Sequence, residues 1–166
     1  MGPFGKRVLT EGLVAGLIGF VVVALFFVVL NLAQGRSPFY TAALLGATLF
    51  YGLEDPADLV VWAGPVLAYN GVHLLVFLVL GVVAAWLASE AERGPQFWYL
   101  ALSLFILLVF HMYGAVLWFA DVLRGALPWW AVGGASLGAG IAMIAYLWRA
   151  HPRLRRQFRE YEDQPI

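Results

Sequence analysis

Two long uncharged stretches decide the fold of this chain. The first is LVVWAGPVLAYNGVHLLVFLVLGVVAAWLAS, residues 59–89, which contains no formal charge. The second is GPQFWYLALSLFILLVFHMYGAVLWFA, residues 94–120, which contains none either. Each exceeds the roughly 20 apolar residues that a helix needs to cross a bilayer. The two stretches are therefore predicted to form a transmembrane helical hairpin around the polar turn 89–96.

Each stretch of the hairpin contains one histidine. His73 precedes Glu92 in the turn, and His111 follows it at the same separation along the chain. Because an α-helix rises about 1.5 Å per residue, the two imidazoles are expected at nearly the same depth in the membrane.

The composition places the whole chain in the membrane. Of its 166 residues, 63% are hydrophobic and only 12% are charged, whereas ordinary soluble domains have about 25% charged residues. We therefore expect one all-α integral membrane domain, residues 1–150, with the lipid bilayer as its first partner. The formal net charge of zero argues against a nucleic-acid partner, and the absence of cysteine excludes disulfides and thiolate metal sites.

Four transmembrane spans are predicted, at about 11–33, 62–88, 97–120 and 127–148. A further apolar segment, 38–53, follows the helix-start signal Ser37-Pro38. The uncharged segment between Arg36 and Glu54 is short for a span. We expect it to form a short re-entrant or interfacial helix in the outer loop of a four-helix bundle.

The distribution of positive charge decides between four and five spans. With four spans, eight Lys and Arg residues share one side and two lie on the other, whereas five spans give a split of three against seven. The eight are Lys6, Arg7, Arg93, Arg149, Arg153, Arg155, Arg156 and Arg159, and the two are Arg36 and Arg124. Since positive residues are enriched in cytoplasmic loops, both termini are predicted to be cytoplasmic. A bacterial inner membrane is the expected location, and residues 151–166 form a charged cytoplasmic tail.

Glycines in the first and fourth spans are the predicted helix-packing positions. Gly12 and Gly16 form a small-xxx-small pattern in the first span, and Gly134 and Gly138 form another in the fourth. Small residues allow the backbones of membrane helices to approach closely. The fourth-span glycines serve equally well as a docking surface for a second protein.

The histidine pair is the candidate cofactor site. An imidazole in hydrocarbon has to be paired, hydrated or ligated, and haem b ligated by His73 and His111 satisfies that requirement. In the alternative, His73 hydrogen-bonds Asn70, Tyr69 or a backbone carbonyl. His111 then hydrogen-bonds Ser136 or the other histidine, as polar residues between membrane helices do. A metal site other than haem iron is not expected, because no carboxylate or third histidine lies at that depth. His151 lies on the cytoplasmic side and joins neither histidine.

Two functions remain open at this point. The sequence contains no recognisable nucleophile, acid–base pair, ion pathway or soluble binding domain, which favours a small non-catalytic subunit within a larger inner-membrane complex, for example an electron-transfer complex. The alternative is a haem b electron-transfer subunit. Glu11, near the start of the first span, is assigned to the positive end of the helix dipole rather than to a proton path.

Overall fold

The computed structural model describes residues 3–92, 127–153 and 156, and within them the chain is helical and contains no strand. Among these described residues, three helices are long and apolar enough to cross a membrane. They are α1 (Pro3–Ala33), α3 (Ala63–Ala91) and α6 (Trp129–Ala150). The described part of the chain is thus a bundle of apolar helices, as the composition predicts.

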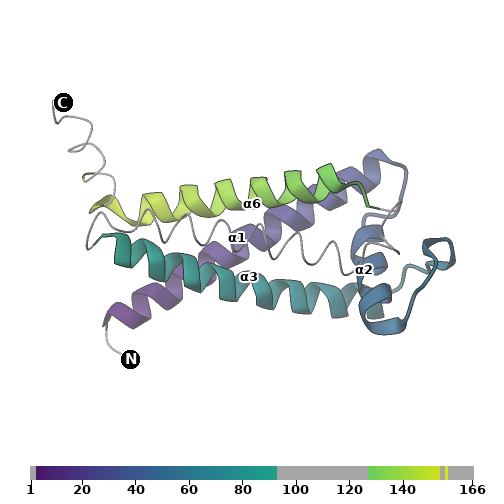
Figure 1. Cartoon of the computed structure of the whole chain (residues 1–166), viewed down its shortest axis with the longest axis horizontal. Coiled ribbons are helices and arrows are strands. Elements are labelled where there is room, and N and C mark those ends of the chain that lie inside the picture. The colour runs from purple at the N-terminus through teal and green to yellow at the C-terminus, as the bar shows by residue number, and fades with distance from the viewer. Residues whose placement is uncertain (1–2, 93–126, 154–155, 157–166) are drawn as a thin grey trace.

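Helix α1 runs obliquely across α3 and α6 (Figure 1). Helix α1 is antiparallel to both α3 and α6. Gly12, early in α1, lies beside Val82 late in α3, and Phe26, late in α1, lies beside Gly134 early in α6. Helices α3 and α6 are therefore parallel to each other. We call the end of the bundle where α1 begins and α3 and α6 finish the N-terminal end, and the other the α2 end.

Because α3 and α6 run in the same direction, the last residue of α3 and the first of α6 lie at opposite ends of the bundle (Figure 1). This arrangement is the one that a four-span topology requires. The predicted third span, 97–120, lies outside the described residues, together with His111. The count of four spans therefore stays a prediction.

Helix α1 begins at Pro3, earlier than the predicted start near residue 11. The first turns contain charged residues that form helix readily, and Arg7 Nε donates to Glu11 Oε1 at 2.9 Å, an i,i+4 pair. Such pairs stabilise a helix surface, so the polar segment continues the apolar helix. At the other ends, α3 and α6 finish slightly later than predicted, at Ala91 and Ala150.

A short helix, α2 (Tyr40–Tyr51), follows α1, and a 3-10 turn, η1 (Pro56–Asp58), follows α2. Helix α2 starts slightly later than predicted, with Phe39 as its N-cap. It ends at Gly52, whose φ of 69° is left-handed, a conformation that glycine adopts without steric cost. In Figure 1, α2 lies across the end of the bundle.

A buried pair of polar side chains fixes α2 to the end of α1. Thr41 Oγ1 donates to Asn31 Oδ1 at 2.9 Å, and Asn31 Nδ2 donates to the Pro38 carbonyl at 3.1 Å. Both side chains are almost completely buried. A buried polar group is costly unless it is hydrogen-bonded, so this pair specifies the turn between the two helices.

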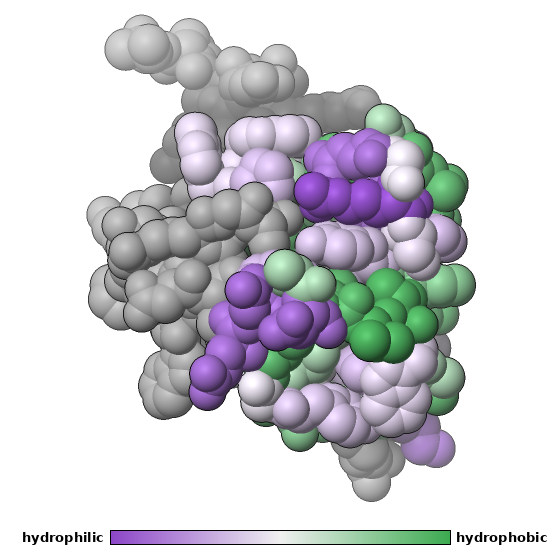
Figure 2. Space-filling view, turned by 90° about the vertical axis from the view of Figure 1, so that its right-hand side faces the viewer, coloured by the Kyte–Doolittle hydropathy of each residue, from purple (hydrophilic) through white to green (hydrophobic). Residues whose placement is uncertain are grey.

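The surface of the α2 end is mixed in character. Figure 2 views this end directly and shows hydrophilic patches separated by hydrophobic surface. Large aromatic side chains are exposed there, including Tyr51, Trp62, Trp129 and Trp130. Aromatic residues of this kind concentrate where a membrane protein meets the headgroup layer.

Helix α1 packs against α3 and against α6 in different ways. Helices α1 and α3 cross where Gly12 and Gly16 lie against Gly81, with backbone meeting backbone. Helices α1 and α6 pack through larger side chains of α1, where Val23 shares a buried cluster with Ala135 and Ala139.

Candidate functional site

His73 lies in the middle of α3 with its ring among other aromatic side chains. Tyr69 stacks on it with ring centroids 5.0 Å apart, and Phe77 meets it edge-on at 4.9 Å. Phe20 reaches it from α1 at 5.9 Å. Tyr69, His73 and Phe77 follow one another at i,i+4 spacing, which places all three on one face of the helix.

The two ring nitrogens of His73 have different surroundings. Nδ1 lies 3.4 Å from the Tyr69 hydroxyl. Nε2 is buried and has no hydrogen-bond partner among the described residues. Asn70, one of the partners considered from the sequence, turns back to its own helix, where Nδ2 donates to the Val66 carbonyl at 2.8 Å.

This arrangement leaves Nε2 available as a ligand atom. When Nδ1 carries the proton and donates it to Tyr69, the lone pair of Nε2 is free. Ligating histidines in proteins ordinarily have their other nitrogen held by a hydrogen bond in this way. His73 Nε2 therefore has no competing hydrogen bond among the described residues, while His111, the other ligand predicted from the sequence, lies outside them. Within the described ranges, no group of three or more His, Asp or Glu side chains is arranged so that it could hold a metal ion.

A second polar site, which the sequence interpretation did not assemble, lies at the N-terminal end of the bundle. We call it the polar clamp; it consists of Arg7, Glu11, Glu92 and His151. The His151 ring sits between two carboxylates, with Nε2 3.0 Å from Glu11 Oε2 and Nδ1 3.0 Å from Glu92 Oε1. The Nε2 contact is close in distance but lacks hydrogen-bond alignment, so it is an ion contact rather than a directed bond.

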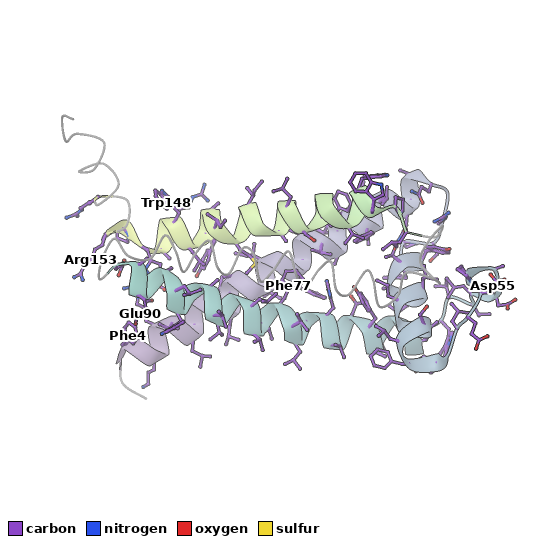
Figure 3. The ribbon with its side chains drawn as sticks, in the orientation of Figure 1. Phe4, Asp55, Phe77, Glu90, Trp148 and Arg153 are labelled. Atoms are coloured by element: carbon purple, nitrogen blue, oxygen red, sulfur yellow. The ribbon has the colours of Figure 1, made fainter. Side chains whose placement is uncertain are left out.

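Arg7 completes the polar clamp from the solvent side. Its guanidinium donates to Glu11 at 2.9 Å and to the Ala150 carbonyl at 3.0 Å, and it lies 3.8 Å from Glu92. The His151 side chain is 0% exposed, whereas that of Arg7 is 45% exposed. Figure 3 locates this end of the bundle by the labelled residues Phe4, Glu90 and Arg153. The clamp thus joins α1, the end of α3 and the end of α6.

One element of the polar clamp was visible in the sequence. Arg7 and Glu11 have the i,i+4 spacing of a helix ion pair, but Glu11 was assigned to the helix dipole. His151 was assigned to the solvated tail, and the structure buries it instead. Its proximity to Glu11 depends on the packing of α6 against α1, which no local pattern contains.

No protein-family model, curated protein or solved structure matches this chain. Its function is therefore argued from the geometry of its own residues.

The four predicted helix-packing glycines occupy two kinds of environment. A side chain at Gly12 or Gly16 would overlap the backbone of α3. A Cβ added at Gly134 would lie 3.5 Å from Phe26, and one at Gly138 would lie 3.6 Å from Val22. The last two distances are ordinary van der Waals contact, so the fourth-span pair faces α1 with more space than the first-span pair.

Proposed function

We propose that this chain is a small non-catalytic integral membrane subunit that packs within a larger inner-membrane complex. The observation that carries this proposal is the outer face of α6, the face turned away from α1. Leu137, Ile141 and Ile144 on this face are 64%, 60% and 65% exposed. Gly133 and Gly140 lie beside them, and a Cβ added at either would meet no described residue within 4 Å.

Glycine on this face suggests a second helix rather than lipid. A glycine inside a helix costs roughly 0.5–1 kcal/mol relative to alanine, and contact with lipid tails offers no compensation for it. Close approach of another membrane helix does, because small residues let the backbones meet. The outer face of α6 therefore supports a helix of another subunit as its partner.

Gly140→Leu should remove the chain from its complex without unfolding it, because leucine would hold the partner helix away from α6. After extraction in a mild detergent, the natural chain should migrate on native gels well above its own mass of 18.3 kDa. The variant should migrate as the single chain, with unchanged thermal stability. Ile141→Leu, a conservative change on the same face, is the matched control.

A natural chain that migrates alone in mild detergent would contradict the proposal. Co-purification of two differently tagged copies of this chain would also overturn it, since the partner would then be a second copy rather than another subunit.

The proposed location is the bacterial inner membrane, with both termini in the cytoplasm. The positive charges support this orientation, since Arg7 contacts the Ala150 carbonyl and Arg153 lies at the same end of the bundle (Figure 3). Cysteine at Ala57, an exposed position beyond α2, should react with a membrane-impermeant maleimide added to intact cells. Cysteine at Lys6 or Arg153 should react only after the cells are opened. Labelling of position 153 in intact cells would reject the orientation.

Haem b binding is the second candidate function, with electron transfer as its role. The buried, partnerless Nε2 of His73 favours it, since the atom that would ligate iron has no competing hydrogen bond among the described residues. Haem iron, when bound, would supply the one-electron chemistry. The residues of the chain that would hold it are His73, through Nε2 with Tyr69 beside Nδ1, and His111 as the second proposed ligand.

A further inference from the structure

An open cavity lies at the α2 end of the bundle, where the end of α2 meets the beginning of α3. Its volume is about 530 Å³, and its described wall includes Ala47 of α2, Pro65 of α3 and much of the loop between these helices. A Cβ added at Gly46 would overlap the backbone of Pro65, so α2 and α3 are in backbone contact beside the cavity. The cavity is therefore supported by two packed helices rather than by the loop alone.

Two aromatic side chains form one corner of the cavity. The rings of Tyr51 and Trp62 both line it, with centroids 5.4 Å apart and planes at 71° to each other. The indole of Trp62 lies over Gly64, where an added Cβ would overlap it. Glycine at position 64 thus leaves room for the indole beside the start of α3. The faces of such rings attract cations.

Three carboxylates line the same cavity, those of Glu54, Asp55 and Asp58. Figure 3 labels Asp55 in the loop beyond α2. None of the three forms an ion pair with a described residue, and the described lining contains no lysine or arginine. Arg36, at the same end of the bundle, lies over the Tyr40 ring at 4.6 Å instead. Within the described part of the chain, the negative charge of the cavity is therefore not compensated, which favours a positively charged ligand.

The shape and chemistry of the lining indicate which kind of cation fits. A divalent metal ion needs several oxygen atoms that converge on one small position, and no described group of His, Asp and Glu side chains is arranged in that way. An organic ammonium ion is larger, and its charge is spread over the carbon atoms bound to nitrogen. Aromatic walls suit such an ion, as they do in known sites for quaternary ammonium groups.

We propose that this cavity binds a small organic cation that carries a methylated ammonium group. Tyr51 and Trp62 contact its methyl groups, while the carboxylates of Glu54 and Asp58 balance its charge. A soluble cation and the headgroup of a lipid can both supply this chemistry. The exposed aromatic side chains at this end of the bundle are typical of the headgroup layer, so both sources can reach the cavity.

Choline chloride is the probe, added to the whole chain in dodecyl maltoside micelles, which carry no charge. Saturation-transfer NMR would follow the methyl protons of choline during a titration in which sodium chloride keeps the ionic strength constant. We expect saturable binding of choline and none of 3,3-dimethylbutanol, which has the same shape without the charge. Equal binding of the neutral compound, or no saturable binding of choline, would overturn the proposal.

Substitutions of the aromatic corner test whether the rings bind the cation. Trp62→Ala should weaken choline binding by about fivefold, as expected for loss of a cation–π contact. Trp62 is half-exposed, so its truncation should leave the bundle folded. Gly64→Ala should also weaken binding, because the new methyl group displaces the indole while every carboxylate stays in place. Trp130→Ala, at an exposed tryptophan of the same end that is not in the described lining, is the matched control and should not change the affinity.

Substitutions of the carboxylates separate a specific site from a merely acidic surface. Glu54→Gln and Asp58→Asn should weaken binding as Trp62→Ala does. If they weaken it while Trp62→Ala does not, the proposal is wrong, because the carboxylates alone would then attract any cation.

Short-chain lipids distinguish the two sources of the ligand. Dihexanoylphosphatidylcholine with deuterated methyl groups should displace choline if the natural ligand is a lipid headgroup, whereas dihexanoylphosphatidylglycerol should not. Saturable choline binding without displacement by either lipid would assign the site to a soluble cation.

Discussion

Alanine at Gly81 should destabilise the bundle by about 3 kcal/mol or more, at the upper end of what overpacking costs. The added Cβ would overlap the Gly12 carbonyl oxygen and lie 2.7 Å from the Gly16 Cα. Both obstacles are backbone atoms, which cannot rotate away as a side chain does. Helices α1 and α3 would have to separate, with loss of packing along their whole contact. The measurement is the midpoint of unfolding in mixed micelles of increasing sodium dodecyl sulfate content.

Gly71→Ala is the matched control on the same helix. A Cβ there would meet nothing within 4 Å in the part of the chain that the structure describes, so the substitution should stabilise α3 by about 0.5–1 kcal/mol through helix propensity alone. Glycine to alanine is therefore expected to lower the stability of the bundle at position 81 and to raise it at position 71 of the same helix. Equal midpoints for the two variants would show that α1 and α3 do not cross at Gly81.

The helices themselves were predictable because membrane spans are specified locally. A run of apolar residues such as 59–89 must satisfy its backbone hydrogen bonds internally and therefore forms a helix. The ends were less predictable. Charged residues like Arg7 and Glu11 end an apolar run without ending a helix, so α1 extends to Pro3.

Helix packing was predictable only on one side of each contact. The sequence named Gly12 and Gly16 as small residues suited to close approach, but it did not identify Gly81 as the position they meet. The spacing of small residues in one helix predicts which face of that helix packs. The residue that this face contacts depends on the crossing angle and the relative height of the two helices. These are set by the whole bundle and leave no local signal.

The polar clamp was likewise not predictable from local sequence patterns. His151 follows the last apolar residue of α6 and is followed by arginines, a pattern typical of a solvated membrane boundary. Only the position of α6 beside α1 brings its ring within 3.0 Å of Glu11. Glu11 lies in α1 and His151 caps the end of α6, far apart in the sequence, so no local pattern could indicate their contact.

Substitution of His73 or His111 should abolish the haem spectrum if the two imidazoles ligate one haem b. In the reduced-minus-oxidised visible spectrum of the purified protein, the sharp bands should disappear or change in His73→Ala and in His111→Ala. His73 Nε2 has no partner among the described residues that competes with this role. His151→Gln is the control and should keep the bands, because the clamp lies at the N-terminal end of the bundle.

The double substitution separates ligation from simple packing. When both histidines take part in one interaction, either single change should cost nearly as much stability as the double change, because the same interaction is lost each time. Without haem, each change should cost about 1–2 kcal/mol, the value of a polar contact between membrane helices. A spectrum without haem bands, together with strictly additive losses, would show that the equal depth predicted for His73 and His111 has no functional meaning. In that event the exposed face of α6, rather than the histidines, would carry the function of the chain.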